Sequence, residues 1–233
     1  MAKEIVRLSS MRAYLSLRVS PQCDPPSVIN SLKKAGRLAW SSPLIERSLR
    51  MASSGHPPSI PGYQEGSVTP QTESSMIVGL MASSVYSGGP VLDMCTGRGV
   101  KAFQFLEKKT REFLEGWDLS GLRIAAAQRE AARLGIPRDR FLLRSGDALA
   151  MEPHTPPRLV LLDAPCSGSG TWARHPDGKL RFSPDKLKEL ASLQSKLLIR
   201  AIDLSPPGGA VLYSTCSLFR EENEQVVAKA MED

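Results

Sequence analysis

The fold is decided by residues 91–99, which read VLDMCTGRG. A short apolar run that is typical of a buried strand ends here in an aspartate and leads into a glycine-rich turn. Glycines between a strand and a helix let backbone N–H groups approach a ligand at the helix N-terminus. Asp118, at the end of the next predicted strand, is placed to accept hydrogen bonds from a ribose diol. Together these features favour a pocket for a nucleoside-type cofactor over an ordinary tight turn.

Strands and helices alternate through the rest of the chain. Apolar strand patterns recur at residues 113–118, 141–144, 159–163 and 210–214, and helical patterns lie at 72–85, 122–134 and 187–201. The run at 159–163 is apolar until its last residue, as is common in strands covered on both faces. This alternation predicts an α/β fold with a doubly wound, Rossmann-like parallel sheet, whose ligands bind beyond the carboxyl ends of the strands.

A smaller unit precedes this sheet. Apolar and polar residues alternate from Ala13 to Val19, which predicts a strand, and helical patterns follow at residues 28–38 and 43–51. A stretch rich in Ser, Gly and Pro at residues 53–62 predicts a linker. We therefore expect a small basic α+β subdomain over residues 1–56 and a larger domain over residues 57–233.

The excess positive charge lies in the smaller unit. The net charge is +6, and residues 1–55 hold nine Lys or Arg against three Asp or Glu, whereas residues 56–233 hold 21 of each. A basic appendage on a balanced body is typical of polyanion binding, because phosphate neutralisation supplies affinity independent of sequence. Charge alone indicates a solubilising surface equally well.

Composition excludes several classes of protein. With 233 residues and 41% hydrophobic content, the chain has enough apolar material for a folded core. It has no apolar run near the roughly 20 residues of a membrane helix and no signal peptide, so we expect a soluble, cytoplasmic protein. The four cysteines are too few and too scattered for a disulfide framework and lack zinc-binding spacing. We expect free thiols, no metal, and a monomer.

Two of these cysteines follow the last two predicted strands. Cys166 stands in Asp163-Ala164-Pro165-Cys166, and Cys216 stands in Ser214-Thr215-Cys216-Ser217. Neighbouring strands are about 4.8 Å apart, so both thiols are expected at the edge of the sheet that binds ligands. A single cysteine is more often a buried hydrophobe, but two in this arrangement favour nucleophilic chemistry over core packing.

A methyl donor, an acid and two thiols suit methylation at carbon 5 of cytosine. That carbon becomes a nucleophile only after a thiolate has added at carbon 6, so covalent catalysis divides the difficult step into two. A carboxyl group at the ring nitrogen relieves the developing charge, and a base later removes the carbon-5 proton. Lys101 is a candidate for lowering the thiol pKa, although a solvated lysine at a helix start is an equal alternative.

At this point the chain resembles the Sun family of RNA cytosine-5 methyltransferases, from about Ser16 to Val227. The shared motifs are Ser16-Leu17-Arg18-Val19, PGYQEGSVTPQ at 61–71, DAPCSGSG at 163–170, RHPD at 174–177, YSTCS at 213–217 and Glu221-Glu222-Asn223. The paired Pro-Cys and Thr-Cys motifs are highly specific. The last motif by itself predicts a helix start, where acids suit the helix dipole.

The resemblance implies a role for each group in the site. Cys216 would be the nucleophile, Cys166 would assist product release, and Asp163 would contact the target cytosine, with Lys101 completing the catalytic set. S-adenosylmethionine would bind to Cys95, Thr96, Gly97, Arg98, Gly99, Val100 and Lys101, with Asp118, Asp147 and Asp163. Asp147 taken alone is equally well explained as a helix cap. The substrate would be ribosomal or transfer RNA, held partly by the basic N-terminal unit.

The sequence departs from the family pattern at two places. The family's cofactor loop usually reads Cys-Ala-Ala-Pro-Gly-Gly-Lys-Thr, whereas residues 95–102 read CTGRGVKA and keep only one of the paired glycines and the lysine. The closing hairpin of the family is expected to be absent after residue 233. An RNA-binding protein that has lost cofactor binding is therefore the alternative hypothesis.

Overall fold

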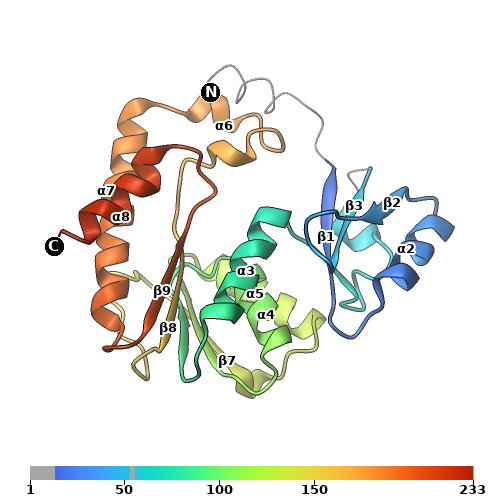
Figure 1. The fold of residues 1–233 in the computed structure, drawn as a ribbon, viewed down its shortest axis with the longest axis horizontal. Coiled ribbons are helices and arrows are strands. Elements are labelled where there is room, and N and C mark those ends of the chain that lie inside the picture. Colours follow the sequence, from blue (N-terminus) through green and yellow to red (C-terminus); the bar gives the residue numbers. More distant parts are fainter. Residues whose placement is uncertain (1–13, 53–55, 233) are drawn as a thin grey trace.

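The computed structural model describes residues 14–52 and 56–232, which form two sheets joined by helices (Figure 1). Residues 1–13, with three of the nine N-terminal basic residues, and residues 53–55 of the predicted linker lie outside the described residues. No helix within the described ranges is long and apolar enough to cross a membrane.

The larger sheet is parallel and five-stranded. Its strands are β5 (Val91–Asp93), β6 (Leu114–Asp118), β7 (Phe141–Ser145), β8 (Leu159–Asp163) and β9 (Ala210–Ser214). They run in the order β7-β6-β5-β8-β9, so the chain moves outward in one direction from β5 and then returns to its other side at β8. The predicted doubly wound α/β fold is confirmed. Its topological switch point lies between β5 and β8, where such sheets bind their ligands.

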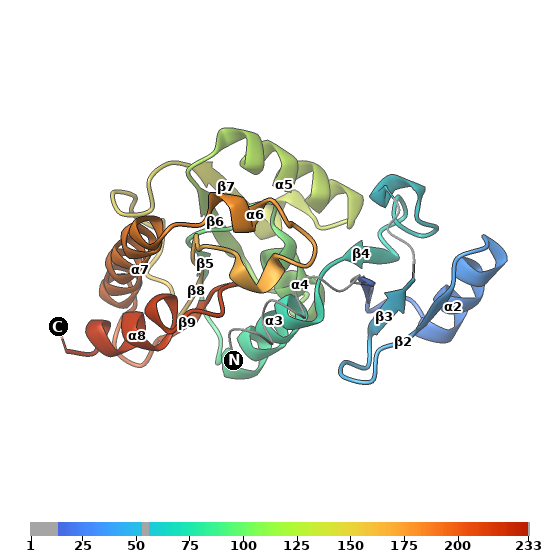
Figure 2. The same ribbon diagram turned by 90° about the horizontal axis from the view of Figure 1, so that it is seen from above.

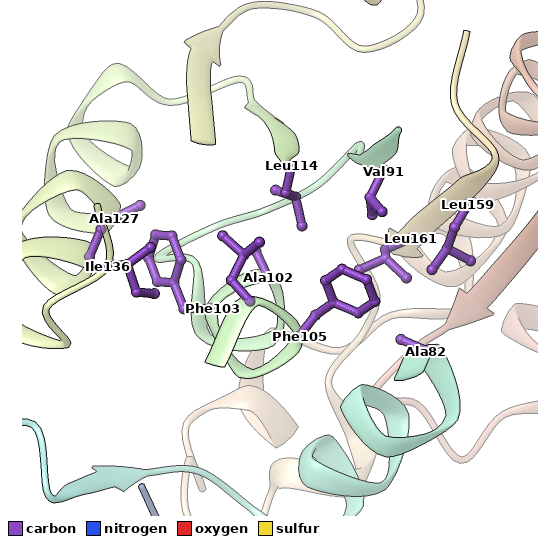
Figure 3. Packing of buried hydrophobic residues seen from close by; sticks show 12 residues of the cluster. Ala82, Val91, Ala102, Phe103, Phe105, Leu114, Ala127, Ile136, Leu159 and Leu161 are labelled. Carbon is purple, nitrogen blue, oxygen red and sulfur yellow. The ribbon is translucent and has the colours of Figure 1, made fainter. Parts of the chain in front are cut away.

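Helices cover both faces of this sheet. One face carries α3 (Glu73–Val85), α4 (Val100–Lys108) and α5 (Gly121–Arg133), and the other carries α7 (Pro184–Leu204) and α8 (Glu224–Ala230). Figure 3 shows Phe105 of α4 beside Leu159 and Leu161, and Phe103 of the same helix beside Ala127 and Ile136. Because alternate strand residues point to opposite faces, both faces of the central strands must be apolar, which explains the unbroken apolar runs in the sequence.

Short helices complete the larger domain. They are α6 (Gly178–Arg181) and the 3-10 turns η1 (Pro57–Ser59), η2 (Arg138–Arg140), η3 (Ser169–Thr171) and η4 (Arg220–Glu222). Figures 1 and 2 show α6 lying over one end of the parallel sheet, beside the loops that follow β8 and β9.

The smaller sheet is antiparallel and lies against the α3–α4 side of the larger domain. Its elements are β1 (Leu15–Val19), α2 (Pro25–Lys34), β2 (Ala39–Ser41), β3 (Ser48–Met51) and β4 (Val68–Pro70), with strand order β2-β3-β1-β4. The division near residue 56 stays a prediction, and the sheet takes strands from both sides of it. Figure 2 shows this sheet to the side of the parallel one.

The helix expected at residues 43–51 is wrong. Residues 48–51 form β3 instead, with Leu49 opposite Leu17 and Met51 opposite Leu15. Leu49 and Met51 are buried on the same face of this sheet. Their spacing of two residues is that of a strand, and pairing with β1 outweighs the helical pattern that the preceding residues suggest.

Three of the basic residues expected to bind a polyanion form ion pairs or hydrogen bonds with other residues of the protein. Arg18 forms a buried ion pair with Glu107 of α4, and Arg50 donates two hydrogen bonds to Glu73 of α3. Arg47 donates to the carbonyl oxygens of Ser20 and Cys23. The charge count therefore overstates the basic surface that this unit offers to a ligand.

Candidate active site

Cys166 and Cys216 lie side by side beyond the carboxyl ends of two neighbouring strands. Strands β8 and β9 are paired so that Asp163 stands opposite Ser214, and each cysteine follows in the next loop. The two sulfur atoms are 3.0 Å apart. Cys216 is exposed and Cys166 is partly buried. The prediction that both thiols lie side by side at the carboxyl edge of the sheet is confirmed.

The two thiols differ in acidity. A hydrogen bond from the Cys166 thiol lowers the pKa of Cys216 to about 7, with a smaller contribution from the positive charge of Lys101, although burial and Asp163 oppose the shift. The same hydrogen bond, together with burial, raises the pKa of Cys166. These opposite shifts favour the thiolate on Cys216 and the proton on Cys166, which distinguishes a nucleophile from a hydrogen-bond donor within the pair.

Lys101 and Asp163 stand next to the thiols. Lys101 Nζ, in the first turn of α4, lies 2.5 Å from Asp163 Oδ2, and its side chain is 19% exposed. Ser214 Oγ donates to the other carboxylate oxygen of Asp163 at 3.0 Å. Lys101 is therefore a partner of the site and not the solvated lysine that was the alternative. Its ion pair keeps the Asp163 carboxyl in one orientation at the sheet edge.

A second carboxyl group is buried beneath this pair. Burial raises the pKa of Asp93, at the end of β5, to about 7, and the negative charge of Asp163 adds to the shift. Asp93 Oδ1 accepts the backbone N–H of Cys95 at 3.3 Å. The same surroundings raise the pKa of Cys95 to about 12, so this third cysteine is an inert part of the loop.

The loop at residues 95–100 connects β5 to the N-terminus of α4. Gly97 N donates to Asp118 Oδ2 at 3.0 Å, and Ser120 N donates to Asp118 Oδ1 at 2.9 Å, so the Asp118 carboxylate is fixed between two turns. Gly97 and Gly99 have left-handed backbones with φ of +57° and +80°. A Cβ on Gly99 would lie 2.1 Å from the Phe103 ring, whereas one on Gly97 would meet nothing within 4 Å. Gly99 therefore serves packing, and Gly97 faces open space.

The remaining predicted cofactor residues lie around this loop. Asp147 is exposed, and its Oδ1 accepts the N–H of Leu149 at 3.0 Å, a local cap that leaves Oδ2 without a partner among the residues that the structure describes. Arg98 lines a shallow cavity with Tyr63 and Thr69, on the side of the N-terminal sheet. The carbonyl oxygen of Val100 accepts a hydrogen bond from Arg18.

Sequence reasoning missed three residues of this region. Leu119, directly after Asp118, is an apolar side chain that is 78% exposed at the rim of the loop. Glu222 and Asn223 are hydrogen-bonded to the two cysteine loops. The tripeptide that contains them is one of the shared family motifs, and by itself it predicts only a helix start.

Comparisons with known proteins point to one family. The profile of the family described as 16S rRNA methyltransferase RsmB/F matches residues 84–233. The ribosomal RNA small subunit methyltransferase B of Erwinia tasmaniensis is 30% identical over 235 residues, which cover 99% of this chain and 54% of that protein. The protein of the same name from Thermus thermophilus is 37% identical over 158 residues, covering 68% of this chain and 38% of that protein. The chain thus spans about half the length of the Erwinia relative.

Solved structures agree with this assignment. The crystal structure of a methyltransferase homologue from Pyrococcus horikoshii superposes with a TM-score of 0.81 at 25% identity, covering 100% of this chain and 74% of that one. The similarity includes the small N-terminal sheet as well as the parallel sheet, since the whole chain is covered.

Proposed function

The chain belongs to the RsmB/F family of 16S rRNA methyltransferases, and we propose that it methylates carbon 5 of a cytosine in ribosomal RNA through a covalent adduct with Cys216. The observation that carries the proposal is the thiol pair, with its sulfur atoms 3.0 Å apart beside Asp163 at the sheet edge. S-adenosylmethionine, the methyl donor expected from the sequence, agrees with the family and supplies the methyl group when bound.

The acidity of Cys216 suits it to the first step. With its pKa lowered to about 7, a large fraction of this thiol is ionised at neutral pH and ready to add to carbon 6 of the base. Asp163 lies on the neighbouring strand end, and its pair with Lys101 holds a proton that can pass through the carboxyl group to the ring nitrogen, which balances the negative charge that the addition creates. Lys101 holds that carboxyl in place through their ion pair.

Cys166 is suited to the release step. Its pKa is raised first by the hydrogen bond with Cys216, then by burial, and then by the charge of Cys216. Once Cys216 is bonded to carbon 6, its sulfur no longer carries that charge, so two of the three influences disappear. Cys166 then loses its proton more readily and becomes the base that takes the carbon-5 proton, after which Cys216 leaves and the product is free.

The loop at residues 95–100 fits a nucleoside cofactor. The N-terminus of the nine-residue helix α4, the open space over Gly97 and the fixed carboxylate of Asp118 form the cradle. Leu119 offers an apolar surface for a base beside Asp118, and Asp147 retains one free carboxylate oxygen. Arg98, at a departure from the family pattern, lines a cavity toward the N-terminal sheet. These observations favour retained cofactor binding over the RNA-binding alternative.

Gly97→Ala is expected to weaken S-adenosylmethionine binding at least about tenfold, because the added methyl group fills space that we assign to the cofactor. Gly135→Ala is the matched control, since Gly135 has a similar φ of +67° and also has nothing within 4 Å of an added Cβ. Both variants should lose about 1 kcal/mol of folding stability from left-handed backbone strain. Titration calorimetry with the cofactor distinguishes the two variants. Equal affinities would show that Gly97 is not part of the cofactor site.

The activity itself is tested by incubating the chain with tritiated S-adenosylmethionine and small-subunit ribosomal RNA, then mapping 5-methylcytosine by bisulfite sequencing. Transfer of label to a cytosine is the expected result. Binding of RNA without measurable affinity for the cofactor would instead support the RNA-binding alternative. Transfer RNA serves as the second substrate in the same assay.

A further inference from the structure

The tripeptide Glu221-Glu222-Asn223 takes no part in the steps above, yet two of its side chains are turned toward the thiols. Glu221 is exposed, whereas Glu222 is completely buried at 0% exposure. A buried acid must have hydrogen-bond partners, because an isolated carboxylate away from water is strongly disfavoured. The hydrogen-bond partners of Glu222 identify the loop that it stabilises.

Glu222 holds the loop that carries Cys166. Its Oε1 accepts the backbone N–H of Ser167 at 2.8 Å, and its Oε2 accepts the hydroxyl of the same serine. Gln194 of α7 donates from one amide nitrogen to Glu222 Oε1 at 3.0 Å and to the carbonyl oxygen of Pro165 at 2.8 Å. The residues on both sides of Cys166 are thus tied to one carboxyl group, directly or through Gln194.

Asn223 holds the loop that carries Cys216 in the same way. Thr215 Oγ1 donates to Asn223 Oδ1 at 2.7 Å, and Asn223 Nδ2 donates to the carbonyl oxygens of Ser217 at 3.1 Å and Phe219 at 2.7 Å. The residues on both sides of Cys216 are again fixed by one side chain. Two consecutive residues of the chain therefore fasten two loops that lie 50 positions apart in the sequence.

We propose that Glu222 and Asn223 are positioning residues that set the distance between the Cys166 and Cys216 sulfur atoms. This inference rests on the proposed covalent mechanism for its purpose, but the spacing itself is a property of the free protein. Because Glu222 and Asn223 are adjacent in the chain, both cysteine loops are hydrogen-bonded to the same short segment. A hydrogen bond between the thiols needs the two cysteine loops to be held in a defined relative position, since its strength falls steeply with distance and angle.

The geometry predicts opposite tolerances at the two positions. Glu222→Gln keeps an acceptor for Ser167 N–H and Gln194, and its amide can donate to the Ser167 hydroxyl, so it should preserve the spacing. Asn223→Asp keeps the acceptor for Thr215 but has no donors for the two carbonyl oxygens, so it should fail as Asn223→Ala does. Glu222→Ala should also fail. Glu221→Ala, in the same tripeptide but exposed, is the matched control.

The first measurement is the pH dependence of iodoacetamide alkylation at Cys216, followed by peptide mass spectrometry in the absence of RNA and cofactor. The wild-type thiol should reach half its maximal rate near pH 7. Glu222→Ala, Asn223→Ala and Asn223→Asp should move this midpoint upward by about one pH unit or more, because the Cys166 hydrogen bond is lost. Glu222→Gln and Glu221→Ala should leave it in place.

The second measurement is the rate at which diamide closes a Cys166–Cys216 disulfide. Diamide takes two electrons and two protons from the thiol pair and becomes a hydrazine, and the new S–S bond forms only where the sulfurs approach closely. We expect the three disruptive variants to react at least about tenfold more slowly than the wild type. Thermal unfolding confirms that each variant is folded. If Glu222→Ala does not fold, Ser167→Ala, which removes the hydroxyl partner of Glu222, replaces it.

Two outcomes would overturn the proposal. Wild-type alkylation and disulfide rates in the disruptive variants would show that the spacing is set elsewhere. Failure of Glu222→Gln alongside Glu222→Ala would show that the charge or proton of Glu222 acts, and not its hydrogen bonds. Since neither measurement uses RNA or cofactor, a wild-type chain without methyl transfer would defeat the proposed function and leave this result intact.

Discussion

Cys216→Ala is expected to abolish transfer of the methyl group to RNA, with turnover falling at least about a thousandfold. Without the thiolate at carbon 6, carbon 5 of cytosine never becomes a sufficient nucleophile, so the remaining binding groups have no reaction to accelerate. Cofactor affinity should change little, since residues 95–100 and Asp118 are intact. Tritium transfer from labelled S-adenosylmethionine measures the first effect, and calorimetry measures the second.

Cys166→Ala should have the opposite effect on the covalent protein–RNA adduct. The covalent adduct forms but is not released, and a protein–RNA band that resists denaturing gel electrophoresis should accumulate. Loss of the Cys166 hydrogen bond also returns the pKa of Cys216 toward its ordinary value, so adduct formation should be slow at pH 7 and become faster as the pH rises. Full activity in Cys216→Ala would disprove the mechanism. Cys23→Ala, in the small sheet, controls for loss of a thiol as such.

The larger sheet could be predicted because its information is local. Strand β8 is buried on both faces and is therefore an apolar run up to Asp163, and helices separate the strands as a parallel sheet requires. Strands β8 and β9 follow each other in the chain and are neighbours in the sheet. The positions of Cys166 and Cys216 follow from that adjacency alone.

The errors arose where distant partners decide the structure. Residues 48–51 are a strand because they pair with β1. This partner lies outside residues 43–51, so that segment alone does not reveal the pairing. The sequence places Glu222 at a helix start and does not indicate its partners, yet Ser167, 55 positions earlier, and Gln194 are hydrogen-bonded to its carboxyl group. Arg18 looked like part of a basic surface for RNA, yet it is 7% exposed and pairs with Glu107. In each case the local sequence is compatible with two structural environments, and contacts with distant parts of the chain decide which one forms.

The buried pair of Arg18 and Glu107 fastens the small sheet to the larger domain. Arg18 lies 2.6 Å from Glu107, each side chain is 7% exposed, and Arg18 also donates to Gln71 and to the carbonyl oxygen of Val100 beside the cofactor loop. Burial lowers the pKa of Arg18 and raises that of Glu107. Both shifts indicate charges that have lost much of their hydration and depend on each other.

Arg18→Met is therefore expected to lower the free energy of unfolding by about 3–5 kcal/mol, because it leaves the Glu107 carboxylate buried without its partner. The double variant Arg18→Met with Glu107→Leu should recover most of that loss, since no unpaired charge remains. Arg181→Met breaks an ion pair with Asp177 whose side chains are 75% and 58% exposed, and should change the stability by less than about 1 kcal/mol. Urea unfolding followed by tryptophan fluorescence reports both units, through Trp40 in the small sheet and Trp117 in the larger one. Equal stability of Arg18→Met and Arg181→Met would mean that the Arg18–Glu107 pair does not help to hold the small sheet.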